Sequence, residues 1–253
     1  MAARSLLILD YFHQFLISAI TSLSVELIAA LSGSYYLNKN LKVNSANRFL
    51  VYFLWLTFFF DLIGSYSPIA YFSNYEYFSF ICVTGRFEYN YWWFNIYMLI
   101  SYGFFFYYFT SFLMKNKVKQ RMNLLIFCYL IVGVGNLICS EIFFNGNSIL
   151  SSTLGTLIVL FSIFLFFFDL LKSDKILTLT KYLPIYIAVG VLVNNIALTP
   201  MAIFSQYFIF NNELFINIKA AIVPIVNVIM YGLFTIGFLK CSKNKNNCNE
   251  LRI

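Results

Sequence analysis

Charged residues are scarce in this chain, at 11% of its 253 residues, whereas soluble domains carry about 25%. This scarcity excludes an ordinary water-soluble enzyme. Hydrophobic residues account for 61% of the sequence and aromatic residues for 21%, and the mean hydropathy is +0.78. Such a composition is typical of a polytopic membrane protein, which places apolar side chains both in lipid and inside the fold.

Metal-binding residues are lacking as well. His13 is the only histidine, and the five cysteines show no C-x-x-C spacing. Neither a zinc site nor the histidine-rich centre of an intramembrane metalloenzyme can be assembled from this set. We therefore predict no metal and no cofactor. Because no motif identifies an activated serine nucleophile either, the sequence favours a protein that is not an enzyme.

Long apolar runs, in contrast, are abundant. A membrane-spanning helix needs about 20 mainly apolar residues to cross roughly 30 Å of hydrocarbon. Seven stretches meet this need, approximately residues 15–37, 49–72, 91–114, 123–144, 148–171, 183–205 and 214–239. We predict an all-α fold with one domain of seven transmembrane helices over residues 1–239, followed by a short basic tail, residues 240–253. An aromatic cluster at Tyr89–Tyr97 predicts an anchor at the membrane interface.

The positive charges are distributed unevenly along the chain. Fourteen of the 17 lysines and arginines fall in the first, third and fifth predicted loops and in the tail, and only Arg4, Arg86 and Lys219 fall elsewhere. Because basic residues flank the cytoplasmic ends of membrane helices, we predict an outside N-terminus and a cytoplasmic C-terminus. The same rule explains the net charge of +7 without a nucleic-acid partner. The absence of an N-x-S/T sequon is consistent with a bacterial inner-membrane protein.

Two carboxylates interrupt the apolar helices near mid-membrane. Glu26 lies in the first predicted helix and Asp61 in the second, each on a face of small and polar residues such as Thr57. Such faces pack against other helices, and an intramembrane carboxylate is by default a functional-site hypothesis. No lysine or arginine is expected at that depth. We therefore expect at least one of the two acids to hold a proton, although the sequence gives no distance between them.

Further polar residues lie at compatible depths in the fourth, sixth and seventh predicted helices. For the asparagines among them, interhelical hydrogen bonds worth about 0.6–2 kcal/mol each are the preferred interpretation. The alternative is a polar cavity walled by the first, second, sixth and seventh helices. The candidate intramembrane site comprises Glu26, Asp61, Thr57, Asn136, Asn194, Asn195, Asn227 and Tyr231.

Three functions remain open. The preferred one is a sensor or regulatory membrane subunit, which would bind an unidentified small molecule or lipid and signal through a cytoplasmic protein partner at the basic loops. The second is a small proton-coupled transporter that uses Asp61 and Glu26, although the odd helix count and the lack of an internal repeat count against it. The third is a membrane enzyme acting on lipid, with the two carboxylates as acid and base.

Overall fold

The structure is a computed structural model that describes residues 2–40, 42–78, 80, 85–173, 179–204 and 213–242, with the backbone alone for residues 2–11, 213–216 and 219. The predicted basic tail beyond Ser242 and the side chain of Lys219 lie outside this description. The described residues contain helices and no strands. The helices are α1 (Ala2–Lys39), α2 (Ser45–Gly64), α3 (Tyr66–Phe72), α5 (Tyr91–Ser111), α6 (Asn116–Cys139), α7 (Ile142–Asn145), α8 (Ile149–Leu171), α9 (Leu183–Phe204) and α10 (Glu213–Ser242).

Several helix ends differ from the predicted ones. The first helix begins at Ala2 rather than near residue 15, because no glycine or proline interrupts residues 2–32. The helix predicted over 123–144 ends at Cys139 and begins earlier than predicted, at Asn116. The earlier start arises because the lysines, arginine and glutamine before residue 123 are good helix formers. The single helix predicted over 49–72 divides at Ser65 into α2 and α3.

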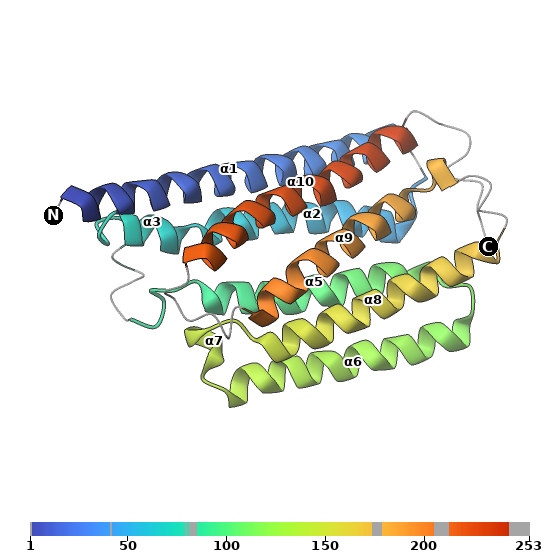
Figure 1. Cartoon of the computed structure of the whole chain (residues 1–253). Helices are drawn as coiled ribbons and strands as arrows, with labels where there is room; N and C mark the ends of the chain where they lie inside the picture. The colour runs from blue at the N-terminus through green and yellow to red at the C-terminus, as the bar shows by residue number, and fades with distance from the viewer. Residues whose placement is uncertain are drawn as a thin grey trace.

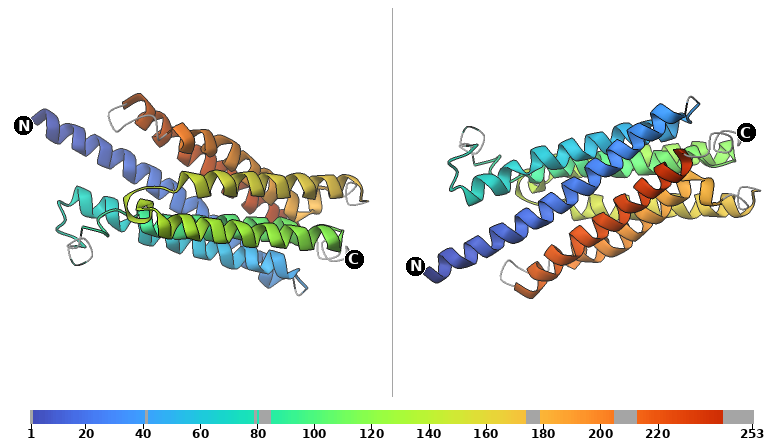
Figure 2. Two further views of the ribbon diagram at one scale, coloured as in Figure 1. Left: turned by 90° about the horizontal axis from the view of Figure 1, so that it is seen from below. Right: turned by 90° about the horizontal axis from the view of Figure 1, so that it is seen from above.

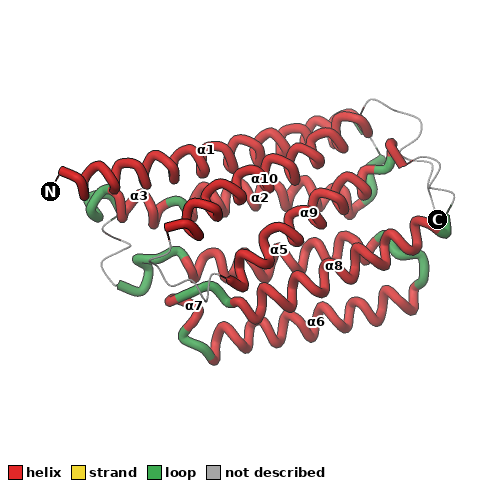
Figure 3. The backbone as a smooth tube through the Cα atoms, viewed as in Figure 1, coloured by secondary structure: helices red, strands yellow, loops and turns green. Residues whose placement is uncertain are grey.

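The long helices run lengthwise beside one another and alternate in direction along the chain (Figures 1 and 3). Six of them form a closed ring, in which α1 contacts α2, α2 contacts α5, and the ring continues through α8, α9 and α10 back to α1. Figure 2 shows the same bundle from two further sides. Helix α6 lies outside the ring and packs mainly against α5 and α8.

The core of the ring consists of large apolar side chains that are fully buried, among them Phe106, Phe109, Ile163, Ile187 and Phe234. Many apolar side chains point outward instead, for example Ile17, Leu124 and Phe164. Water disfavours so much exposed apolar surface, whereas the hydrocarbon of a bilayer accepts it. The outer surface of the bundle is therefore suited to lipid.

Six helical segments are long and apolar enough to cross a membrane, namely Phe12–Lys39, Ser45–Phe72, Asn116–Cys139, Ile149–Leu171, Leu183–Phe204 and Ala220–Ser242. They indicate an integral, multi-pass membrane protein in a lipid bilayer. The predicted seventh span corresponds to α5, which has 21 residues but is not among these segments, because its tyrosines, tryptophans and asparagine lower its hydropathy. Six of the seven predicted spans are therefore supported, and the seventh stays a prediction.

Candidate functional site

The two intramembrane acids meet in the structure. The carboxyl groups of Glu26 in α1 and Asp61 in α2 lie within hydrogen-bonding reach of each other. Glu26 is only 1% exposed, while Asp61 is partly exposed. Oε2 of Glu26 is buried and accepts no hydrogen bond from an N–H or O–H donor among the described residues. Because an ionised carboxylate can only accept hydrogen bonds, a bond between the two groups requires a proton on one of them.

Small residues bring the two helices close enough for this contact. Ala29, Ala30 and Gly33 follow Glu26 on α1 and are buried. A Cβ atom on Gly33 would lie 2.9 Å from Cγ2 of Val51 in α2 and 3.3 Å from the ring of Phe238 in α10. Close backbone approach of this kind is what small residues permit in membrane helices. It holds α1 against α2 and α10 together.

Two tyrosines from other helices face the acid pair. Tyr97 of α5 and Tyr231 of α10 are each close enough to interact electrostatically with both carboxyl groups. The hydroxyl oxygens of Tyr97 and Thr57 are 2.9 Å apart, and Thr57 donates its own proton to the carbonyl oxygen of Phe53. Tyr97 is therefore the donor to Thr57. Its oxygen retains lone pairs that can accept a hydrogen bond from a protonated carboxyl group of the acid pair.

A hydrogen bond between α10 and α1 lies beside the acid pair, toward the start of α1. Nδ2 of Asn227 in α10 donates to Oγ of Ser22 in α1 over 3.0 Å. Ser22 and Asn227 lie four residues before Glu26 and Tyr231, which is about one helical turn. The structure thus gathers Glu26, Asp61, Thr57, Asn227 and Tyr231 from the predicted set at the junction of α1, α2, α5 and α10. We call this group, together with Tyr97 and Ser22, the carboxyl cluster.

The two neighbouring asparagines of α9 point in different directions. Asn195 accepts a hydrogen bond from Thr156 of α8 over 3.3 Å, and Thr156 is also bonded to Tyr102 of α5 over 3.0 Å. Asn195 thus belongs to a second polar group and partly lines a groove of about 390 Å³ between α8 and α9. The buried Oδ1 of Asn194 has no hydrogen-bond partner among the described residues.

The helix register indicates which neighbour Asn194 faces. Gly190, four residues earlier, packs against the carbonyl oxygen of Met230 and the ring of Phe234 in α10. Residues four apart share one face of a helix. Asn194 therefore lies on the face of α9 that is turned toward α10 near the carboxyl cluster.

The structure places Asn136 away from the acid pair. Its Nδ2 donates to Oγ of Ser148 over 2.7 Å, at the turn that precedes α8. Asn95 of α5 fastens the same turn, because it accepts from the backbone N–H of Ser148 over 3.1 Å and donates to the carbonyl oxygen of Gly146 over 2.9 Å. Asn136 thus connects α6 to the start of α8, and α6 lies outside the ring that holds the acids.

Sequence reasoning missed the contribution of α5. The sequence predicts an interfacial anchor at Tyr89–Tyr97, and this stays a prediction. Within the same segment Asn95 is buried and Tyr97 belongs to the carboxyl cluster. Trp93 is half-buried and donates from Nε1 to the carbonyl oxygen of Phe60 over 2.8 Å. One sequence feature could have indicated that α5 has a polar inward face. Tyr97 and Ser101 are four residues apart and therefore lie on the same face of the helix. The aromatic composition of the segment obscured it.

The chain matches no family model, no curated protein and no solved structure. Within the described residues, no group of three or more histidine, cysteine, aspartate or glutamate side chains could hold a metal ion.

The carboxyl cluster lies at a change in packing density. Along α1, Glu26 is the first buried residue among the described side chains, and along α10 it is Val226. Helix α9 runs in the opposite direction, and its last buried residue is Asn195. Beyond this level, toward the start of α1, the described side chains of these three helices are all partly or fully exposed. Glu26 therefore marks the boundary between a closely packed half of α1, α9 and α10 and a more open half.

Proposed function

We propose that this protein is a membrane sensor or regulatory subunit that responds to protons through Glu26 and Asp61 and signals through a cytoplasmic protein partner. The observation that carries the proposal is the pair of carboxyl groups within hydrogen-bonding reach, one of them fully buried. Two carboxylates at such a distance share one proton, because two adjacent negative charges in an apolar interior strongly repel each other.

The proton is expected to control the contact between α1 and α2. With one proton present, the acids are joined by a hydrogen bond and the two helices stay together. Its loss replaces that bond by repulsion between two like charges, which favours separation of the helices. Helices are rigid enough to carry such a change along their length, and α1 and α2 meet again at the basic end of the bundle, near Lys39 and Arg48.

Trp93 provides a natural reporter for this response, because it is bonded to the carbonyl of Phe60, the residue before Asp61. In a variant that keeps Trp93 but carries Trp55→Phe and Trp92→Phe, we expect tryptophan emission to change in one step as the pH is raised. The measurement is fluorescence of the purified protein in detergent or nanodiscs. Constant emission at every pH at which the protein stays folded would contradict the proposal.

We also propose that α5 is a seventh span and that the N-terminus is outside the cytoplasmic membrane of a bacterium. Helix α5 is about 31 Å long at 1.5 Å per residue, enough to cross the hydrocarbon, and no charged residue interrupts it. Lys39, Arg48, Lys115 and Lys172 lie at one end of the bundle, whereas Arg4 lies at the other. This excess of basic residues supports a cytoplasmic location for the first end.

Truncated reporter fusions test this topology. A fusion after Asn90, before α5, is expected to give active alkaline phosphatase, and a fusion after Lys117, beyond α5, is expected to give fluorescent GFP. The expectation follows because each span moves the following residue to the other side of the membrane. If both fusions report the same side, α5 does not cross; if the two sides are exchanged, the orientation is reversed.

Proton-coupled transport is the second candidate, and the partial exposure of Asp61 beside the buried Glu26 favours it. On this candidate function, protons would reach Asp61 from one side through the more open half of the bundle. Transport also requires release to the other side. Proton flux or substrate uptake in proteoliposomes distinguishes the two functions, since a sensor responds to pH without sustained flux.

A further inference from the structure

A groove formed by described residues lies between α5 and α6 and is separate from the carboxyl cluster. Its volume is about 1230 Å³, above the roughly 300–1,000 Å³ of ordinary small-ligand pockets. The walls are mainly apolar side chains, including Ile96, Leu99, Ile100, Leu130, Leu137 and Ile138. The groove exists because α6 lies outside the ring and leaves one side of α5 uncovered.

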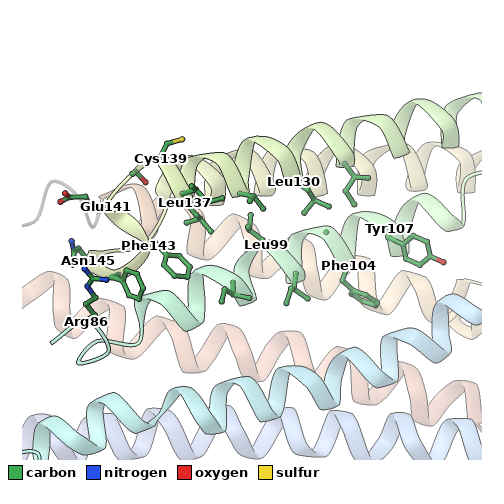
Figure 4. A pocket seen from close by; sticks show the side chains of 18 residues that line it. Arg86, Leu99, Phe104, Tyr107, Leu130, Leu137, Cys139, Glu141, Phe143 and Asn145 are labelled. Carbon is green, nitrogen blue, oxygen red and sulfur yellow. The ribbon is translucent and has the colours of Figure 1, made fainter. Parts of the chain in front are cut away.

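The two ends of the groove differ in chemistry. Figure 4 shows Arg86, Glu141 and Asn145 at one end, and Tyr107 at the other. Arg86 and Glu141 are both exposed, so a positive and a negative side chain can reach a ligand at the same end. The apolar part of the groove between them and Tyr107 carries no charged lining residue.

The length of the groove matches half of a bilayer. On α5 the lining extends from Ile96 to Tyr107, which corresponds to about 16 Å at 1.5 Å per residue. The hydrocarbon core of a bilayer is about 30 Å thick. The apolar walls therefore cover the depth of one leaflet, and the charged side chains lie where the head group of a lipid in that leaflet would be.

We propose that this groove is a binding site for one phospholipid with an ethanolamine head group. The acyl chains lie along α5 and α6, Arg86 binds the phosphate, and Glu141 binds the ammonium group. Guanidinium groups pair well with phosphate oxygens, and carboxylates pair with ammonium groups. The opposite charges at the mouth thus complement a zwitterionic head group. The bound lipid fills the space between α6 and the ring and fastens α6 to α5.

Gly103 allows the groove to be blocked without disturbing the helices. It lines the groove, and a Cβ atom placed on it would have Leu130 as its nearest neighbour, at an ordinary contact distance of 3.8 Å. Gly103→Leu therefore puts a side chain into the lipid space. Gly135→Leu is the matched control, because Gly135 lies on α6, does not line the groove, and has no atom within 4 Å of such a Cβ.

Native mass spectrometry of the whole protein, purified from bilayers of phosphatidylethanolamine and phosphatidylglycerol, tests the site. We expect the wild type and Gly135→Leu to retain one phosphatidylethanolamine. Gly103→Leu and Arg86→Gln are expected to retain about tenfold less. The leucine occupies the space of the acyl chains, and the glutamine removes the charge that binds the phosphate. Arg86→Lys, which keeps the positive charge, should recover part of the binding. Thermal unfolding of each variant without added lipid shows whether it is folded.

The remaining outcomes overturn the proposal. Equal retention of both lipids by all folded variants identifies ordinary boundary lipid. Preferential retention of phosphatidylglycerol that depends on Arg86 assigns the mouth to an anionic head group and removes Glu141 from the site. A wild-type dimer that Gly103→Leu converts to a monomer shows that a second copy of the chain occupies the groove.

Discussion

The Asp61→Asn variant is expected to lose the pH response of Trp93 completely. An asparagine amide has the shape of a protonated aspartic acid and donates a hydrogen bond, but it cannot lose a proton at ordinary pH. It therefore keeps its bond to Glu26 at every pH and holds α1 against α2. Emission should stay at the value that the wild type shows in acid. Fluorescence of the variant that retains only Trp93 provides the measurement.

Asp169→Asn is the matched control for this experiment. Asp169 lies in the last turn of α8, and its Oδ2 accepts a hydrogen bond from the backbone N–H of Met114 over 2.9 Å. The same chemical change there leaves the acid pair intact, so the pH response should be retained. Glu26→Gln should behave like Asp61→Asn, because either amide replaces the shared proton. A folded Asp61→Asn variant that responds to pH like the wild type would remove the acid pair from the function.

The Gly155→Ala variant is expected to be destabilised by about 1–3 kcal/mol, the usual cost of overpacking a core. Gly155 of α8 faces α5, and an added Cβ would lie 2.5 Å from the ring of Tyr102 and 2.7 Å from the hydroxyl of Tyr129. The ring of Tyr102 must leave its rotamer or α5 must move away from α8, and either change costs free energy. The hydrogen bond between Tyr102 and Thr156 is then lengthened as well. Thermal unfolding in one detergent measures the effect.

Gly135→Ala serves as the reference for Gly155→Ala. It is also a glycine within a membrane helix, but a Cβ there meets no atom within 4 Å. Alanine favours the helix over glycine by up to about 1 kcal/mol, so this variant should be as stable as the wild type or more stable. Equal melting temperatures for the two variants would show that α5 and α8 are not in close contact at Gly155.

The membrane helices could be predicted from the sequence because their signal is local. An apolar run of sufficient length forms a helix in lipid whatever its neighbours are, and the small residues beside Glu26 and Asp61 already indicated that these acids face inward. Their meeting could not be predicted, because it depends on how far α1 is rotated and shifted against α2. The rotation and shift of α1 against α2 depend on the packing of both helices together and cannot be inferred from the residues of one helix.

The unknown offset and rotation of the helices also explain why only some of the predicted asparagines lie near the acid pair. Asn136, Asn195 and Asn227 lie in apolar helices at similar expected depths, yet each bonds to the neighbour its own helix happens to have: Asn227 bonds to α1, Asn195 to α8, and Asn136 to the start of α8. Which helices are adjacent is a property of the ring. For the asparagines, the sequence predicts the depth along each helix but not which neighbouring helix each side chain meets.

The length of α1 has a mechanical consequence. The helix has 38 residues, and the part before Glu26 extends for about 36 Å at 1.5 Å per residue. Within this part, the side chains of residues 12–25 are all partly or fully exposed. A small rotation of α1 at the acid pair is therefore amplified along a lever arm. In the proposed response to protons, the first turns of α1 would undergo the largest displacement, so a spectroscopic label placed there would report the protonation of a site that it does not touch.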